Sequence, residues 1–402
     1  MLILKSKLGM TILYKRIKSK FVDMRYGIKC GSIDELAPTD WGLCHALEHM
    51  FFRGTTNRDW SEINRGTKRI GGYSNAQTGY SNTLYQMNTT KDAFRAGFEI
   101  LADCMYNSKF PEEWWEVEKG AIITEINMRE DSPDLVLAEY AIENALGKRA
   151  HDISGSPSNI ENATIADLLR FRNSYYSGPN LVLAIAGDLS KQEVLKVVNR
   201  FDKWPSRKPV PRKAVTGKFN YAPVSLHRKE LAQAYVLKMK PIKLVSDEED
   251  FAMGVAGDVL STILFEELRE KQGLCYGAGC SFFDDITDKE IVEIGTSVDR
   301  SNLKPILGLL DKTLTYFLKE GLTDARLEET RATVKRQLLT ASETPSANTK
   351  MMLDVYFDGD TTDKLTVYTG FLKTIKDSYI RKIAKKHLVG NFKTCIMTEK
   401  SK

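Results

Sequence analysis

The stretch DWGLCHALEHMFFRG, residues 40–54, carries two of the five histidines in a chain of 402 residues. Leu43 and Leu47 recur in it at helical spacing, which predicts a helix with one buried face. Asp40 is a suitable N-terminal cap, and Gly54 can adopt the left-handed conformation that ends a helix. The segment therefore predicts one short helix with clear ends that holds both histidines.

His45 and His49 are four positions apart, so on a helix their rings project from the same face, one turn apart. Two imidazoles at that separation can hold one Zn²⁺ ion. Glu48 lies beside them, where a carboxylate can take a proton from water that the metal activates. The alternative interpretation is a chance pattern on a solvated helix. Because catalytic zinc usually has three protein ligands, one ligand is still missing.

A second predicted helix, EEWWEVEKGAIITEINMRED at residues 112–131, offers carboxylates for the third position. Glu118 and Glu125 are seven positions apart in it and share a face. The isoleucines predict a largely buried helix, in which Glu125 needs a partner. That partner is a metal or, in the alternative, an arginine or a lysine. The remaining three histidines are expected to be surface or structural residues: His151, His227 and His387.

Composition limits the class of protein and its partners. The chain has 58 lysines and arginines against 53 acidic residues, spread along its length, so we expect no nucleic-acid partner. Six cysteines without a C-x-x-C pair predict a reducing compartment rather than a disulfide framework. The N-terminus MLILKSKLGMTILYKR is broken by lysines, and no later apolar run could cross a bilayer. We therefore expect a cytoplasmic protein with no membrane partner and no room for an N-terminal targeting peptide.

One segment is typical of a linker. KWPSRKPVPRKAVTGK, residues 203–218, holds three prolines, six lysines or arginines and no acid. On both sides of it, strand patterns such as LVLAIAGDLS and EIVEIGTSV mix with helical patterns, and both halves end in a helix followed by a strand. We expect an α+β protein of two similar domains, 1–204 and 220–402, each a mainly antiparallel sheet packed with helices. A basic, proline-containing linker at 205–219 joins them.

Four stretches together resemble the pitrilysin family of inverzincin zinc metallopeptidases, most of all its short-chain branch that includes mitochondrial processing peptidase. They are GSIDELAPTDWGLCHALEHMFFRGT, IGGYSNAQTGYSNTLY, EKGAIITEINMREDSPD and LFEELREKQGLCYG. Family members carry H-x-x-E-H and a distant glutamate ligand, and the 76 positions from His49 to Glu125 are similar to the family spacing. The resemblance implies one zinc ion per chain, held by His45, His49 and Glu125. It also implies that Glu48 is the general base and later the general acid.

The resemblance implies further roles outside the ligand set. Glu118 would orient a ligand or its ring, although it could instead be an ordinary acid on the helix face. Asn75 and Ala76, in the segment GGYSNAQT, would lie beside the scissile bond on a strand edge that pairs with an extended peptide. Arg269 would hold a substrate carbonyl, and the hydroxyl of Tyr276 would stabilise the oxyanion. Without the resemblance, Arg269 would be interpreted as part of a charged helix end.

The function implied by the resemblance is that of a zinc endopeptidase acting on peptides or unfolded segments. Two chains would form a clamshell chamber, as a homodimer or with a related chain, and Arg269 and Tyr276 of one chain would complete the zinc site of the other. Two alternatives remain, a non-catalytic scaffold subunit and a metal-dependent sensor or binding module. The sequence departs from the family pattern at KLGMT, where a Pro-Asn-Gly-like turn is common, and at Cys44, where a small residue is usual.

Overall fold

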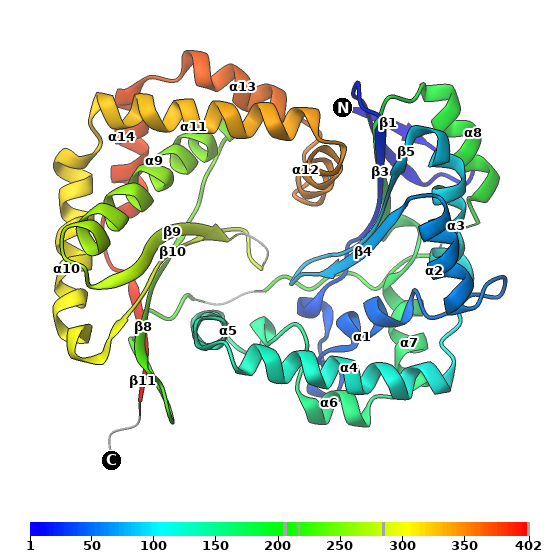
Figure 1. Ribbon diagram of the computed structural model, residues 1–402, viewed down its shortest axis with the longest axis horizontal. Coiled ribbons are helices and arrows are strands. Elements are labelled where there is room, and N and C mark those ends of the chain that lie inside the picture. Colours follow the sequence, from blue (N-terminus) through cyan, green and yellow to red (C-terminus); the bar gives the residue numbers. More distant parts are fainter. Residues whose placement is uncertain (204–206, 216–217, 284–285, 400–402) are drawn as a thin grey trace. The chain divides into compact units, whose positions relative to one another are not determined.

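The computed structural model describes residues 1–203, 207–215, 218–283 and 286–399 (Figure 1). The chain forms two compact units, and each of them is discontinuous in sequence. The first unit consists of Met1–Met128, Arg149–Ala214 and Leu339–Leu365. The second unit consists of Arg129–Lys148, Val215–Leu338 and Thr366–Lys402.

The first unit contains a six-stranded sheet. In spatial order its strands are β1 (Leu2–Lys5), β2 (Thr11–Arg16), β6 (Leu181–Gly187), β3 (Phe21–Ile28), β5 (Thr83–Thr90) and β4 (Tyr73–Thr78). The β2–β6 pair is parallel, and the other pairs are antiparallel. Strand β6 is buried along its whole length, as the unbroken apolar run LVLAIAG predicts. Strand β4 is at the end of the order, so among the described strands it pairs with β5 alone.

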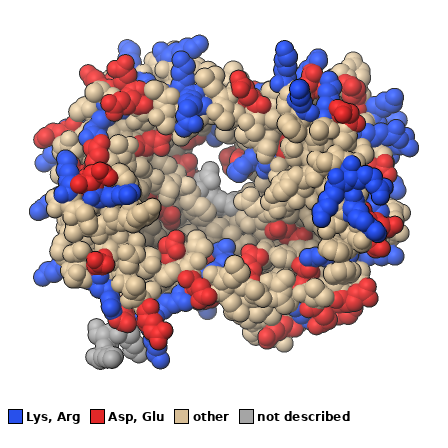
Figure 2. Space-filling view, in the orientation of Figure 1, with Lys and Arg blue, Asp and Glu red and all other residues tan. Residues whose placement is uncertain are grey.

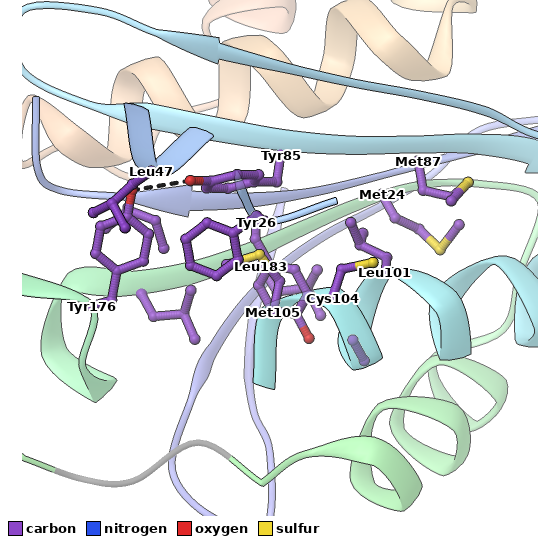
Figure 3. Close-up of a cluster of buried hydrophobic side chains, with 14 of the residues drawn as sticks. Met24, Tyr26, Leu47, Tyr85, Met87, Leu101, Cys104, Met105, Tyr176 and Leu183 are labelled. Carbon is purple, nitrogen blue, oxygen red and sulfur yellow. Dashed lines mark hydrogen bonds between the residues drawn. The ribbon is translucent and has the colours of Figure 1, made fainter. Parts of the chain in front are cut away.

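Helices cover both faces of this sheet. The core on one face takes side chains from α1 (Leu43–Met50), α3 (Phe94–Asn107), α7 (Ile165–Tyr175) and α8 (Lys191–Phe201). There Leu47 of α1 lies beside Tyr85 and Tyr176, whose hydroxyl oxygens are 3.0 Å apart (Figure 3). On the other face lies α12 (Pro345–Phe357) (Figure 1). Its Leu353 is buried against β6. The unit also holds α2 (Trp60–Arg69), α6 (Pro157–Asn162) and most of α4 (Glu112–Glu130).

The second unit is built on a five-stranded sheet. Its order is β7 (Val224–Arg228), β11 (Lys393–Glu399), β8 (Gln233–Ile242), β10 (Glu290–Asp299) and β9 (Cys275–Phe283), with only the β7–β11 pair parallel among the described strands. The apolar helix α9 (Asp247–Phe265) fills its core. The other helices assigned wholly or mainly to it are α5 (Pro133–Leu146), α10 (Leu303–Tyr316), α11 (Asp324–Glu343), α13 (Lys364–Thr374) and α14 (Asp377–Leu388).

The predicted fold class is confirmed: two α+β bodies, each with a mainly antiparallel sheet packed with helices. The predicted ranges 1–204 and 220–402 differ from the two units in the segments 129–148 and 339–365. These segments carry α5 and α12, whose apolar faces are buried on sheets formed by strands that are distant in sequence. Local sequence patterns do not predict which sheet a helix packs against. Of the predicted linker, residues 205, 206, 216 and 217 lie outside the described part of the chain, as does residue 400 of the predicted closing strand.

A buried lysine fastens α5 to the second sheet. Lys393 of β11 is fully buried, and its Nζ donates hydrogen bonds to Asn144 Oδ1 at 2.7 Å and to the backbone oxygen of Ala222 at 2.6 Å. Burial lowers the pKa of Lys393 from its ordinary value. Because a buried ammonium group without these acceptors would be costly, the contact holds α5 in place.

The surface carries both signs of charge. On the face in Figure 2, the described lysines and arginines are interspersed with aspartates and glutamates. This agrees with the even spread of charge along the sequence. In the described part of the chain, no helix has both the length and the apolar character that a membrane crossing requires.

Gly31 generates a stability prediction, because a Cβ at this position would lie 2.4 Å from the backbone oxygen of Tyr80. We expect Gly31→Ala to lower the free energy of unfolding by roughly 1–3 kcal/mol, the usual cost of overpacking. The matched control is Gly370→Ala in α13, where a Cβ meets nothing within 4 Å. Urea unfolding of both variants measures the difference. Equal stability of the two variants would contradict the close approach at Gly31.

Candidate metal centre

The helix that carries the two histidines, α1, has only eight residues and is shorter than the sequence predicts. Its N-cap is Gly42, with φ of +92°, rather than Asp40. The buried carboxylate of Glu35 accepts hydrogen bonds from the backbone N–H groups of Gly42 at 2.8 Å and Cys44 at 2.7 Å. The prediction of a cap at Asp40 was wrong, because the left-handed turn presents these N–H groups to an acid from an earlier loop. Gly54 lies beyond the helix and does not end it.

Three predicted ligands come together from α1 and α4. One potential ligand atom from each of His45, His49 and Glu125 lies within 4.8 Å of the other two. Glu125 Oε2 is 3.6 Å from Nε2 of either histidine. In a tetrahedral zinc site with bonds of about 2.0–2.2 Å, neighbouring ligand atoms are roughly 3.4 Å apart. The two imidazoles and the carboxylate therefore fit a zinc ion in both chemistry and spacing.

The two acids on α4 differ from expectation in their burial. Glu125, expected among buried isoleucines, has a side chain that is 44% exposed, whereas the side chain of Glu118 is fully buried. A ligand with one open side leaves room for a substrate next to the metal. A buried acid needs partners within the protein.

The buried carboxylate of Glu118 contacts His49 and Arg53. Its Oε2 is 2.8 Å from His49 Nδ1, and its Oε1 is 2.5 Å from Arg53 Nη2. When Nδ1 donates its proton to Glu118, the Nε2 lone pair of His49 is left to face the ligand cluster. Burial acts to lower the pKa of His49, but hydrogen bonds to Glu118 and Glu125 outweigh it and raise this pKa to about 9.

Arg53 is itself held by two tryptophans. Its guanidinium carbon lies 5.7 Å from the ring centroid of Trp60 and 5.4 Å from that of Trp114. The two rings contact each other with centroids 5.4 Å apart. Because the guanidinium is confined over these faces, it neutralises the buried Glu118 from a fixed position.

Glu48 is next to the ligands and bonds to the edge strand. Its Oε2 accepts a hydrogen bond of 2.5 Å from the hydroxyl of Thr78, the last residue of β4. Burial raises the pKa of Glu48 above its ordinary value, while the Thr78 hydrogen bonds and the nearby His49 act to lower it. The carboxylate is therefore largely shielded from water and held in one orientation.

The two predicted substrate-binding residues lie on the same strand. In β4, Asn75 is exposed and Ala76 is partly buried, as the alternation of a strand requires. Both residues line a pocket of about 240 Å³ together with Glu48, His49 and Phe52. The structure thus brings Asn75 and Ala76 to the candidate centre.

Arg269 and Tyr276 lie side by side in the second unit. Arg269 belongs to a π-helical turn, Glu266–Glu270, that continues α9, and Tyr276 is the second residue of β9. The guanidinium carbon of Arg269 is 4.8 Å from the ring centroids of both Phe265 and Tyr276. Tyr276 is 80% exposed, so its hydroxyl is available to a ligand or a partner.

Sequence reasoning missed three residues of the centre: Glu35, Arg53 and Thr78. Glu35 acts on the start of α1, Arg53 on Glu118, and Thr78 on Glu48. Only Thr78 carried a usable signal, since a strand that places Ala76 on the inner face also places Thr78 there. The other two contacts depend on loop paths that no local pattern specifies.

Comparison with known proteins gives matches in both halves of the chain. Residues 11–154 match the family described as Insulinase (Peptidase family M16), and residues 162–334 match the Peptidase M16 inactive domain. The candidate ligands all lie in the first of these segments. An uncharacterised zinc protease of Bacillus subtilis, YmxG, is 29% identical over 320 residues, which cover 77% of this chain and 76% of the relative.

Solved structures share the whole fold. A protease from Helicobacter pylori superposes with a TM-score of 0.87 at 20% identity and covers 99% of both chains. The periplasmic protease PqqL from Escherichia coli gives a TM-score of 0.83 at 15% identity, but this chain covers only 45% of its length. On these matches in both halves, and on its relatives, this chain belongs to peptidase family M16, the pitrilysin family.

Proposed function

We propose that the chain is a zinc-dependent endopeptidase that cleaves peptides or unfolded polypeptide segments. The observation that carries this proposal is the cluster of His45, His49 and Glu125 with the carboxylate of Glu48 beside it. The name zinc protease, given to relatives such as YmxG, supports the same metal and the same class of reaction.

The ligand set would be His45 Nε2, His49 Nε2 and an oxygen of Glu125, with one zinc ion per chain. When bound, zinc supplies Lewis-acid activation of water and of a carbonyl oxygen. Glu118 holds His49 through Nδ1 and thereby fixes the tautomer that leaves Nε2 free of its proton. On this contact we assign to Glu118 the role of orienting the His49 ring toward the metal.

Glu48 is the group we assign to proton transfer. Its carboxylate would accept a proton from the attacking water and donate it to the leaving amine, so the residue is unchanged after each cycle. The burial that raises its pKa makes it a better base than an exposed glutamate. The hydroxyl of Thr78 donates to Oε2, and Oε1 is the oxygen that we assign to the water.

Substrate would bind as an added strand along β4. The outer edge of this strand is open among the described strands, and its backbone N–H and C=O groups can pair with an extended peptide. Asn75 and Ala76 would then lie beside the bond to be cut. Binding of this kind recognises the substrate mainly through its backbone and less through its side chains, which suits a peptidase of unfolded segments.

We further propose that two chains act together, as a homodimer or with a related chain. The length of PqqL, more than twice that covered by this chain, supports an arrangement in which two such halves cooperate. Arg269 and Tyr276 of one chain would then contact the substrate at the zinc site of the other, the arginine on a carbonyl and the tyrosine on the oxyanion. The cytoplasm is the proposed compartment, since six cysteines without a disulfide framework suit a reducing environment.

The role of Glu48 is tested by Glu48→Gln. We expect cleavage of an internally quenched peptide to fall by roughly 10²–10⁴-fold, because the variant lacks the base, while bound zinc measured by mass spectrometry stays at one ion per chain. Glu116→Gln is the matched control, since this exposed glutamate of α4 pairs with Lys119 and is not part of the cluster. Full activity of Glu48→Gln would contradict the assignment, and a wild-type chain with zinc but no cleavage would favour a scaffold or a binding module.

Zinc binding should depend on pH. Below the pKa of His49, about 9 in the metal-free chain, zinc must displace a proton from the ring. We expect the apparent affinity to rise roughly tenfold per pH unit between pH 6.5 and 8.5, measured by competition with a chromophoric chelator. His227→Gln, which alters an exposed histidine of β7, should show the same slope. An affinity that stays constant over this range would contradict His49 as a ligand.

The two-chain site is tested by complementation. Glu48→Gln and Arg269→Ala chains should each be nearly inactive, because each lacks one half of every site. After mixing and subunit exchange, the mixed dimers contain one intact site, so activity should return to roughly a quarter of the wild-type level. If each site is complete within one chain, mixing restores nothing.

A further inference from the structure

Strand β4 and helix α1 are joined by one short polar contact. The hydroxyl of Thr78 donates to Glu48 Oε2 at 2.5 Å, and a backbone hydrogen bond from Thr78 reaches the same carboxylate. Hydrogen bonds to an ionised carboxylate are shorter and stronger than those between neutral groups. Thr78 is thus a direct neighbour of the residue to which we assign proton transfer.

The position of Thr78 in the strand explains why its hydroxyl faces Glu48. Along β4 the partly buried residues are Ser74, Ala76 and Thr78, and the residues between them are exposed. Strand periodicity therefore turns the Thr78 side chain to the same face as Ala76, which lines the pocket with Glu48. Thr78 also pairs with Thr83 where the β4–β5 hairpin closes, so its backbone is held from the other side.

We propose that Thr78 is a positioning residue, which holds the Glu48 carboxylate in its productive orientation and ties that orientation to the strand along which substrate binds. The inference rests on the proposed peptidase function and deepens it. A glutamate has freely rotating side-chain torsions, and an acid that must face a water within hydrogen-bond reach gains from one fixed oxygen. Two donors from one residue of a paired strand supply that restraint.

The restraint has a consequence for substrate binding. A peptide that pairs with the open edge of β4 would fix the strand between two neighbours, the peptide and β5. Because Thr78 is part of that strand, docking would also narrow the range of positions open to Glu48. Thr78 should therefore affect the chemical step more than it affects binding.

The test compares Thr78→Val with Thr78→Ser. Valine keeps the shape of threonine but removes the hydroxyl donor, so we expect kcat to fall roughly 10- to 100-fold with KM changed less than about threefold. Serine keeps the donor and should restore kcat to within about threefold of wild type. Zinc content, measured by mass spectrometry, should stay at one ion per chain in both variants, because Thr78 is not one of the three candidate ligands and its hydroxyl bonds to Glu48.

The matched control is Thr90→Val, at the end of β5 farthest from Thr78, which makes the same hydroxyl-to-methyl change in the same sheet. If Thr78→Val does not fold, Thr78→Ala takes its place. Its kcat must then fall by the same factor, while Thr78→Ser stays active. The inference is overturned if the folded variant without a hydroxyl, Thr78→Val or Thr78→Ala, has the wild-type kcat. It is also overturned if that variant loses its zinc. A wild-type chain that binds zinc but cleaves no peptide overturns the proposed function, and the inference with it.

Discussion

Two buried carboxylates fix the short helix α1, and the geometry of the candidate centre depends on them. Glu35 accepts the N–H groups at the start of the helix, and Glu118 bonds to His49 in its last turn. Each acid is almost entirely removed from water, which would be costly without these hydrogen bonds. The helix is therefore held at both ends by hydrogen bonds to buried carboxyl groups, one of which, Glu118, is also paired with Arg53.

The apolar core sets the other constraint on the same helix. Leu47 is buried against Tyr85 and Tyr176, so the helix cannot rotate without exposing it (Figure 3). With that face fixed, His45 and His49 must point to the side where α4 brings Glu125. Packing thus determines which way the histidines face, and the buried acids determine their detailed placement.

The candidate ligands could be predicted from the sequence better than the residues that hold them in place. The spacing of His45 and His49 needs only the period of a helix, and the distant Glu125 followed from the resemblance to a family. The cap at Asp40 was wrong because a positive φ at Gly42 depends on tertiary context. Arg53 could not be found because its role depends on a fully buried Glu118 and two tryptophan rings from different helices.

The fold shows the same division between local and distant information. The apolar run of β6 and the helical periods were sufficient for the α+β class. The units to which α5 and α12 belong could not be predicted from the sequence. Helix α5 contacts Lys393 on β11, and α12 packs on the buried face of β6, and both partners are far away in sequence. A linker is a local feature, whereas docking of a helix on a sheet is a property of the folded chain.

The most direct test of this account is a crystal structure of the zinc-loaded chain with anomalous data at the zinc absorption edge. We predict one strong peak per chain at about 2.0–2.2 Å from His45 Nε2, His49 Nε2 and an oxygen of Glu125. A peak at another set of residues, or no peak in crystals grown with excess zinc, would contradict it.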